Sequence, residues 1–159
     1  MGGGLLYRLF RVGRMPKSVR DEIARERVLF QVEGIHVSLH QTGHVPGKYV
    51  KGGVSFGWGA FAVTDRRVIG SRGRVKWVDV PYEQPSEGPA TFILDPTGMH
   101  VLFDLDRMGH ESMRGSMRID FTQPFTDQDL ARFPVRQLSF PVDPQKVVRL
   151  SGSLLKLKD

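Results

Sequence analysis

The chain contains no cysteine, so it can form neither a disulfide nor a thiolate-ligated metal site. It also has no apolar run near the roughly eighteen residues that a membrane-crossing helix needs. At 159 residues, with 40% hydrophobic and 25% charged residues, its composition is close to the globular average. The sequence therefore predicts one globular domain, and we expect neither a metal site nor a cofactor.

Acidic residues are scarce in the first half of the chain. Residues 1–78 carry 14 bases and 5 acids, residues 79–145 carry 5 bases and 11 acids, and residues 146–159 carry 4 bases and 1 acid. A basic half can bind anionic lipid, nucleic acid, an acidic partner or the acidic half of a second copy. A solvated surface of mixed charge is the ordinary alternative.

Residues 1–27 form a basic N-terminal arm followed by a short helix. The first twenty residues carry five bases and no acid. On a helix, Leu5, Leu9 and Val12 would lie on one side and the arginines on the other. Such a segment can lie in a membrane interface, or it can pack its leucines on the domain.

Two short helices have recognisable start signals. Pro16 and Ser18 predict a helix over 17–26 with Ser18 as its N-cap. Thr126, followed three residues later by an aspartate, predicts a second helix over 127–133 with Thr126 as its N-cap.

Between the helices, residues 28–121 consist of short β-rich runs separated by Gly, Pro and Asp, and together with the second helix they make up a β domain over 28–134. The turns are too short for parallel crossovers, so consecutive strands must be antiparallel. The sequence thus predicts a mainly β domain. The predicted strands are 28–33, 35–41, 54–63, 66–71, 74–80, 90–95, 99–105 and 116–121.

Three motifs occur in the same order as in a known superfamily: F-A-V-T-D-R-R-V-I at 61–69, V-D-V-P-Y at 78–82 and G-M-H-V-L-F-D at 98–104. Over about residues 26–134 the chain resembles bacterial pleckstrin-homology and GRAM-like domains. The resemblance implies a strongly bent sandwich or partly open barrel of about seven strands, closed by a C-terminal helix. Such domains mostly bind lipid headgroups, peptides or copies of themselves. Arg72, Arg74 and Lys76 loosely match the bases that hold inositol phosphates in eukaryotic relatives.

Residues 53–57 spell G-x-S-x-G, the pattern of a nucleophile elbow around Ser55. An elbow needs a sharp turn from a strand into a helix, whereas the residues from Trp58 to Asp65 read as strand. We therefore expect a protein without enzymatic activity, and a small serine hydrolase that uses Ser55 is the alternative.

The histidines do not suggest a metal site. His36 and His40 share one face of a predicted strand but lie about 13 Å apart, which is too far to ligate one ion together. His44 has no cysteine or carboxylate cluster near it in the sequence.

The best candidate for a functional surface is a set of bases beside a Gly-rich loop over 43–53. Tyr49, Trp58 and Trp77 lie among them, an arrangement typical of a protein that binds anionic lipid headgroups or an acidic protein. Nucleic acid is a third, weaker hypothesis. The ordinary alternative is that Arg66 and Lys76 face outward from their strands and only pair with carboxylates. The predicted binding residues are Lys48, Lys51, Arg66, Arg67, Arg72, Arg74 and Lys76.

Residues 135–159 form a tail that is too apolar to be solvated. Prolines at 134, 141 and 144 favour an extended arm, which can dock on a second copy and complete its sheet. The sequence therefore predicts a self-associating, cytoplasmic protein that can bind peripherally to a membrane.

Overall fold

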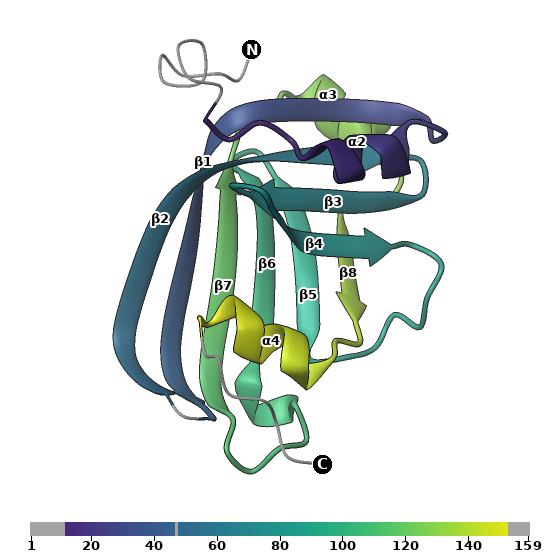
Figure 1. The fold of residues 1–159 in the computed structure, drawn as a ribbon. Helices are drawn as coiled ribbons and strands as arrows, with labels where there is room; N and C mark the ends of the chain where they lie inside the picture. The colour runs from purple at the N-terminus through teal and green to yellow at the C-terminus, as the bar shows by residue number, and fades with distance from the viewer. Residues whose placement is uncertain (1–11, 47, 153–159) are drawn as a thin grey trace.

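The computed structural model describes residues 12–46 and 48–152, which form one curled antiparallel sheet with three short α-helices (Figure 1). The predicted mainly β fold is confirmed, with eight strands in place of about seven. Their order across the sheet is β4-β3-β2-β1-β7-β6-β5-β8. The strands are β1 (Val28–Val45), β2 (Lys48–Thr64), β3 (Arg67–Arg72), β4 (Val75–Pro81), β5 (Ala90–Asp95), β6 (Gly98–Asp104), β7 (Arg114–Thr122) and β8 (Gln137–Phe140).

Strands β1 and β2 form one long hairpin, which corrects two predictions. The runs 28–33 and 35–41 are a single strand, because a bulge at Gly34, with φ of 69°, bends β1 without ending its pairing. The segment 43–53 is not a loop, since pairing continues down to Val45 and Lys48.

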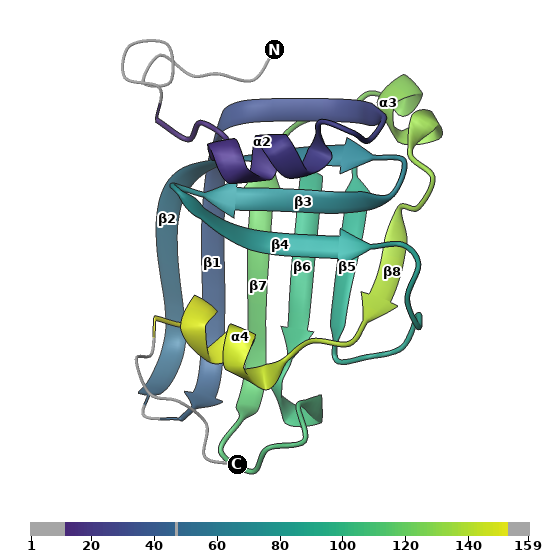
Figure 2. The same ribbon diagram turned by 45° about the vertical axis from the view of Figure 1, so that its right-hand side comes forward.

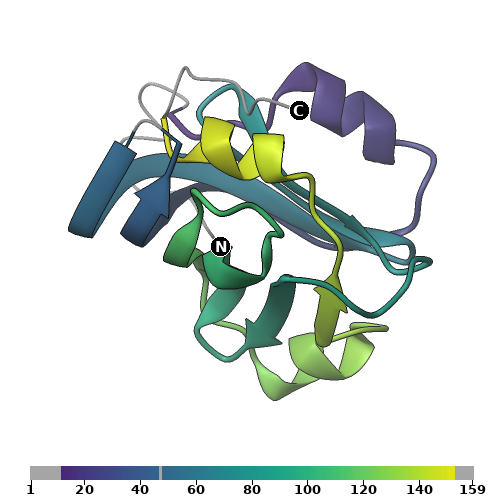
Figure 3. The same ribbon diagram turned by 90° about the horizontal axis from the view of Figure 1, so that it is seen from below.

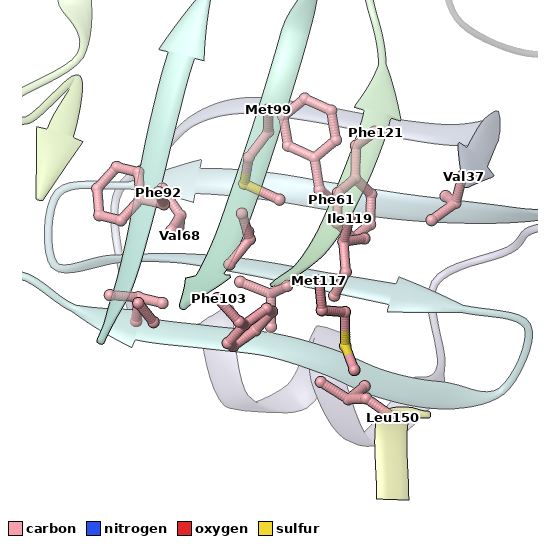
Figure 4. Packing of buried hydrophobic residues seen from close by; sticks show 14 of the residues in the cluster. Val37, Phe61, Val68, Phe92, Met99, Phe103, Met117, Ile119, Phe121 and Leu150 are labelled. Atoms are coloured by element: carbon pink, nitrogen blue, oxygen red, sulfur yellow. The ribbon is translucent and has the colours of Figure 1, made fainter. Parts of the chain in front are cut away.

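The main core lies between the two ends of this sheet. The upper part of β2 (residues 59–64), together with β3 and β4, lies across β5, β6 and β7 (Figure 2). Phe61 from β2 is fully buried and packs edge-on against Phe121 from β7. Figure 4 shows side chains of this core: Val37, Phe61, Val68, Phe92, Met99, Phe103, Met117, Ile119, Phe121 and Leu150.

Helix α2 (Lys17–Ile23) covers the opposite face of the same part of the sheet. Val19 and Ile23 are buried in a second apolar cluster with Met15, Ala60, Ala62 and Ile69. The predicted Ser18 cap is wrong, because the helix already begins at Lys17 with Pro16 as its N-cap residue. The upper part of β2 is consequently covered on both faces.

Helix α3 (Asp127–Arg132) begins with the predicted cap. Thr126 Oγ1 accepts a hydrogen bond from the Asp129 amide at 3.1 Å, and the Asp129 carboxylate accepts one from the Thr126 amide at 3.0 Å. This last bond lowers the pKa of Asp129. Leu130 is buried.

The tail does not leave the domain as an extended arm, within the part that the structure describes. β8 pairs with β5 of the same chain, and residues after Pro141 form helix α4 (Pro144–Leu150). Asp143 accepts a hydrogen bond from the Gln145 amide and Pro144 occupies the first turn, so the segment starts a helix. Helix α4 lies near the lower end of the sheet, which Figure 3 shows from below. The leucines at 154–157 and the apolar residues at 5–10 lie outside the described residues.

No helix within residues 12–46 and 48–152 is long and apolar enough to span a membrane.

Candidate functional site

A basic hollow lies between the lower part of β2 (residues 48–58), the part of β1 that pairs with it, the start of β4 and the end of α4. Its volume is about 470 Å³. Three bases line it, and none of its described lining residues is Asp or Glu. Its polar and aromatic lining residues are Gln41, Lys48, Ser55, Arg72, Trp77, Arg149 and Ser151.

The pairing of β1 with β2 places these residues on the inner face of the sheet. Leu39, a core residue, pairs with Ser55, and Gln41 pairs with Gly53. Side chains alternate between the two faces of a strand, so Gln41 and Ser55 share the inner face with Leu39.

Arg72 is held across β2 by three contacts. Its guanidinium donates hydrogen bonds to Ser55 Oγ at 2.9 Å and to the Phe56 carbonyl at 2.7 Å. It also lies 4.9 Å from the centre of the Trp77 ring, a cation–π distance. Gly57 leaves the space for it, because a Cβ there would lie 2.3 Å from Arg72 Nε.

Lys48 closes the other side of the hollow. Its ammonium donates a hydrogen bond to the Ser151 carbonyl just after α4, which joins the start of β2 to the end of this helix. Arg149 is an exposed residue of the last turn of α4. Two of the three bases are thus held in place by hydrogen bonds, and the third lies at the rim.

Gln41 adds a hydrogen-bond donor without an acceptor. The residue is only 5% exposed, and its amide nitrogen Nε2 is buried with no partner among the described residues. A buried polar group left unpaired costs about 1–3 kcal/mol. An acceptor atom bound in the hollow would remove this cost.

The outer face of the same part of β2 carries four exposed apolar residues, which we call the aromatic strip. Tyr49 is 62% exposed, Val54 48%, Phe56 63% and Trp58 37%. They make up four of the seven large hydrophobic side chains exposed among the described residues, so exposed apolar surface is concentrated here. His36 lies beside the rings of Phe56 and Trp58.

The seven predicted bases do not form one surface. Only Lys48 and Arg72 line the hollow, and Lys51 is exposed nearby on β2. Arg66 lines a second hollow of mixed charge with Asp65, Glu83 and others. Arg74 lines a third, near Arg14, Lys17 and Arg20. Alternation along the strands and the turn at Gly73 separate these side chains.

Lys76 belongs to a network of ion pairs, as the ordinary alternative held for it, and Arg67 belongs to the same network. Arg67 contacts Glu26 at 2.7 Å and Asp79 at 3.3 Å, and Lys76 contacts Asp79 at 3.0 Å. The hydrogen bond to Glu26 raises the pKa of Arg67. Burial opposes the charge of Lys76, but its hydrogen bond to Asp79 and other contacts with carboxylates outweigh this, so its pKa is also raised. The network ties α2, through Glu22, and the turn after α2, through Glu26, to β3 and β4.

The G-x-S-x-G segment does not form a nucleophile elbow. Ser55 lies within continuous strand β2, its hydroxyl accepts a hydrogen bond from Arg72, and no histidine lines the hollow in its described part.

A second serine near a histidine also lacks the geometry of a catalytic triad. Ser38 Oγ at 3.2 Å and Asp120 Oδ2 at 3.3 Å both approach the same nitrogen of His40, whereas a triad uses opposite nitrogens. The described residues contain no cluster of three or more His, Cys, Asp or Glu that could hold a metal ion.

Two polar residues that line the hollow, Gln41 and Arg149, were not predicted from the sequence. Gln41 follows Val37 and Leu39 at alternate positions, so a polar residue at a core position was a signal for it. Arg149 could have been found only by recognising that Asp143 and Pro144 begin a helix.

No protein-family model, curated protein or solved structure matches this chain. The resemblance to pleckstrin-homology and GRAM-like domains therefore stays a prediction.

Proposed function

We propose that this protein is a non-enzymatic binding module of the cytoplasm that attaches to anionic membrane surfaces through the lower part of β2. The observation that carries the proposal is the aromatic strip, with the exposed Lys51 on the same strand. Aromatic rings favour the headgroup level of a bilayer, and bases near it are attracted to anionic lipid.

The position of the strip supports contact with a flat surface. β3 pairs only with residues 59–63 of β2, so residues 48–58 have β1 as their one strand neighbour among the described residues. This edge of the sheet stands apart from the other strands at the left of Figure 1. A membrane could therefore contact the aromatic strip and Lys51 together.

An acidic protein, a second copy of the chain and nucleic acid are the competing partners. A lipid surface is favoured because the aromatic strip exposes four apolar side chains. Binding of a nucleic-acid backbone or of an acidic peptide does not need such an exposed apolar surface. The predicted resemblance to pleckstrin-homology and GRAM-like domains over about residues 26–134 is compatible with lipid, peptides and a second copy alike.

Vesicle co-sedimentation tests the proposal. The wild type should bind phosphatidylcholine vesicles containing phosphatidylglycerol, and bind pure phosphatidylcholine weakly. Phe56→Ser should weaken binding at least tenfold, since burying a Phe side chain contributes about 1.5–3 kcal/mol. Leu102→Ser is the matched control, because Leu102 is 39% exposed on β6, four strands away in sequence order.

Equal binding to both kinds of vesicle, or equal losses in the two variants, would contradict membrane attachment. Light scattering in the absence of lipid separates the remaining partners. A dimer that Phe56→Ser converts to a monomer would assign the aromatic strip to a second copy instead.

A further inference from the structure

We infer that the basic hollow is a binding site for a phosphate monoester, a small organic molecule that carries a terminal phosphate. The inference goes beyond membrane attachment and does not rest on it, because the hollow lies on the inner face of β2 and the aromatic strip on the outer face. It also differs from the hairpin site implied by the resemblance, since Arg74 and Lys76 do not line the hollow.

The charge of the hollow favours a dianion. Lys48, Arg72 and Arg149 line it with no described carboxylate among them. A phosphate monoester carries a charge of about −1.5 to −2 near neutral pH, whereas a carboxylate carries −1. A guanidinium also matches two phosphate oxygens at once.

The neutral groups of the hollow supply donors as well. The buried amide nitrogen of Gln41 lacks an acceptor among the described residues, and rotation of the amide about its last bond can exchange the positions of its nitrogen and oxygen. Ser55 accepts from Arg72, so its own hydroxyl hydrogen can be donated. Phosphate oxygens are hydrogen-bond acceptors, so they can accept from the Gln41 amide and the Ser55 hydroxyl.

The size of the hollow indicates that the phosphate carries an organic group. A volume of about 470 Å³ falls within the range of small-molecule sites and exceeds what one phosphate fills. Leu39, Val50, Leu150 and Trp77 provide apolar surface in the same hollow. A short polyol or sugar bearing the phosphate fits this combination.

Isothermal titration calorimetry of the full chain tests the site, with glycerol 3-phosphate as the probe and lactate at matched ionic strength as the carboxylate control. The wild type should bind glycerol 3-phosphate and not lactate. Gln41→Met should weaken binding about tenfold, because it removes one hydrogen bond to a charged group. Its melting temperature without ligand should stay equal or rise, because the unpaired amide is gone.

A second variant keeps the test decisive if Gln41→Met does not fold. Arg149 is exposed, so Arg149→Gln should fold normally and weaken binding of glycerol 3-phosphate about tenfold. Arg136→Gln, an exposed base before β8, is the matched control and should leave binding unchanged. Absence of binding to the wild type, or equal effects of the two arginine variants, would overturn the inference.

Vesicles distinguish a lipid headgroup from a free ester. If the phosphate belongs to a lipid, the wild type should prefer phosphatidic acid, a monoester, over phosphatidylglycerol, a diester, and Arg149→Gln should lose this preference. If the ligand is free, calorimetry shows binding without that preference. Phe56→Ser should keep its affinity for glycerol 3-phosphate, so failure of membrane attachment is distinguishable from failure of the phosphate site.

Discussion

The two parts of strand β2, residues 48–58 and residues 59–64, differ in burial and in strand pairing. Residues 59–64 are all buried, pair with β1 and β3, and lie between the main core and α2. Residues 48–58 include no buried residue and pair with β1 alone. One continuous strand therefore passes from a part that holds the fold together to a part with exposed aromatic rings on one face and a basic hollow on the other.

This difference separates stability from binding along a single strand. A side chain in the upper part is surrounded by protein, so its loss leaves a cavity. A side chain in the lower part has solvent on one side, so its loss should change binding more than folding. Paired substitutions in the two parts can break or sharpen this comparison.

The largest contrast is expected between two phenylalanines. Phe61→Ala should lower the free energy of unfolding by about 3–5 kcal/mol, because Phe61 is fully buried among other aromatic rings. Phe56→Ala should change it by about 0.5 kcal/mol or less, because Phe56 is 63% exposed. Urea denaturation measures both values. Similar losses in the two variants would show that the lower part also supports the fold.

Two arginines of β3 provide the next contrast. Arg67→Gln should lower the free energy of unfolding by about 2–3 kcal/mol, because it leaves the carboxylate of Glu26, whose side chain is 6% exposed, without its charged partner. The side chain of Arg67 is 22% exposed, so the loss stays below that of a fully buried ion pair. Arg72→Gln should cost less than about 1 kcal/mol and weaken binding of glycerol 3-phosphate. Thermal unfolding and calorimetry on the same samples test both. An Arg72 variant that melts lower than the Arg67 variant would contradict the assignment.

Two glycines of β2 sharpen the comparison further. A Cβ at Gly59 would lie 2.0 Å from the Ser71 carbonyl oxygen, a backbone atom that cannot move aside, so Gly59→Ala should cost about 1–3 kcal/mol. A Cβ at Gly57 would meet the flexible Arg72 side chain instead. Gly57→Ala should therefore leave the melting temperature nearly unchanged and displace Arg72, which weakens phosphate binding. Equal melting temperatures for the two variants would contradict this prediction.

Much of the fold could be predicted from local sequence because its signals are local. Alternation along the strands predicted the mainly β architecture, and the cap at Thr126 gave the start of α3 correctly. The bulge at Gly34 and the helix start at Pro144 were missed, because a Gly or Pro in the sequence reads equally well as a break.

The candidate site was predicted less well because it depends on which distant residues meet. Nothing local shows that Arg72 lies over β2 while Arg67 pairs with Glu26 of a preceding turn. Arg149 reaches the hollow only through the placement of α4, about a hundred residues beyond Lys48. Sequence separation of this size leaves no periodic signal.

The smallest expected effect concerns Lys51, an exposed base of the lower part of β2. Lys51→Gln should weaken binding to phosphatidylglycerol vesicles by at most about fivefold at low salt, since one base near an anionic surface contributes about 1 kcal/mol. The loss should fade toward 1 M salt, where the Debye length falls to about 3 Å. Arg136→Gln removes the same charge beside β8, at the opposite edge of the sheet, and should leave vesicle binding unchanged at every salt concentration. If both variants lost affinity equally, the attraction would come from the net charge of +6, and the lower part of β2 would have no special role in it.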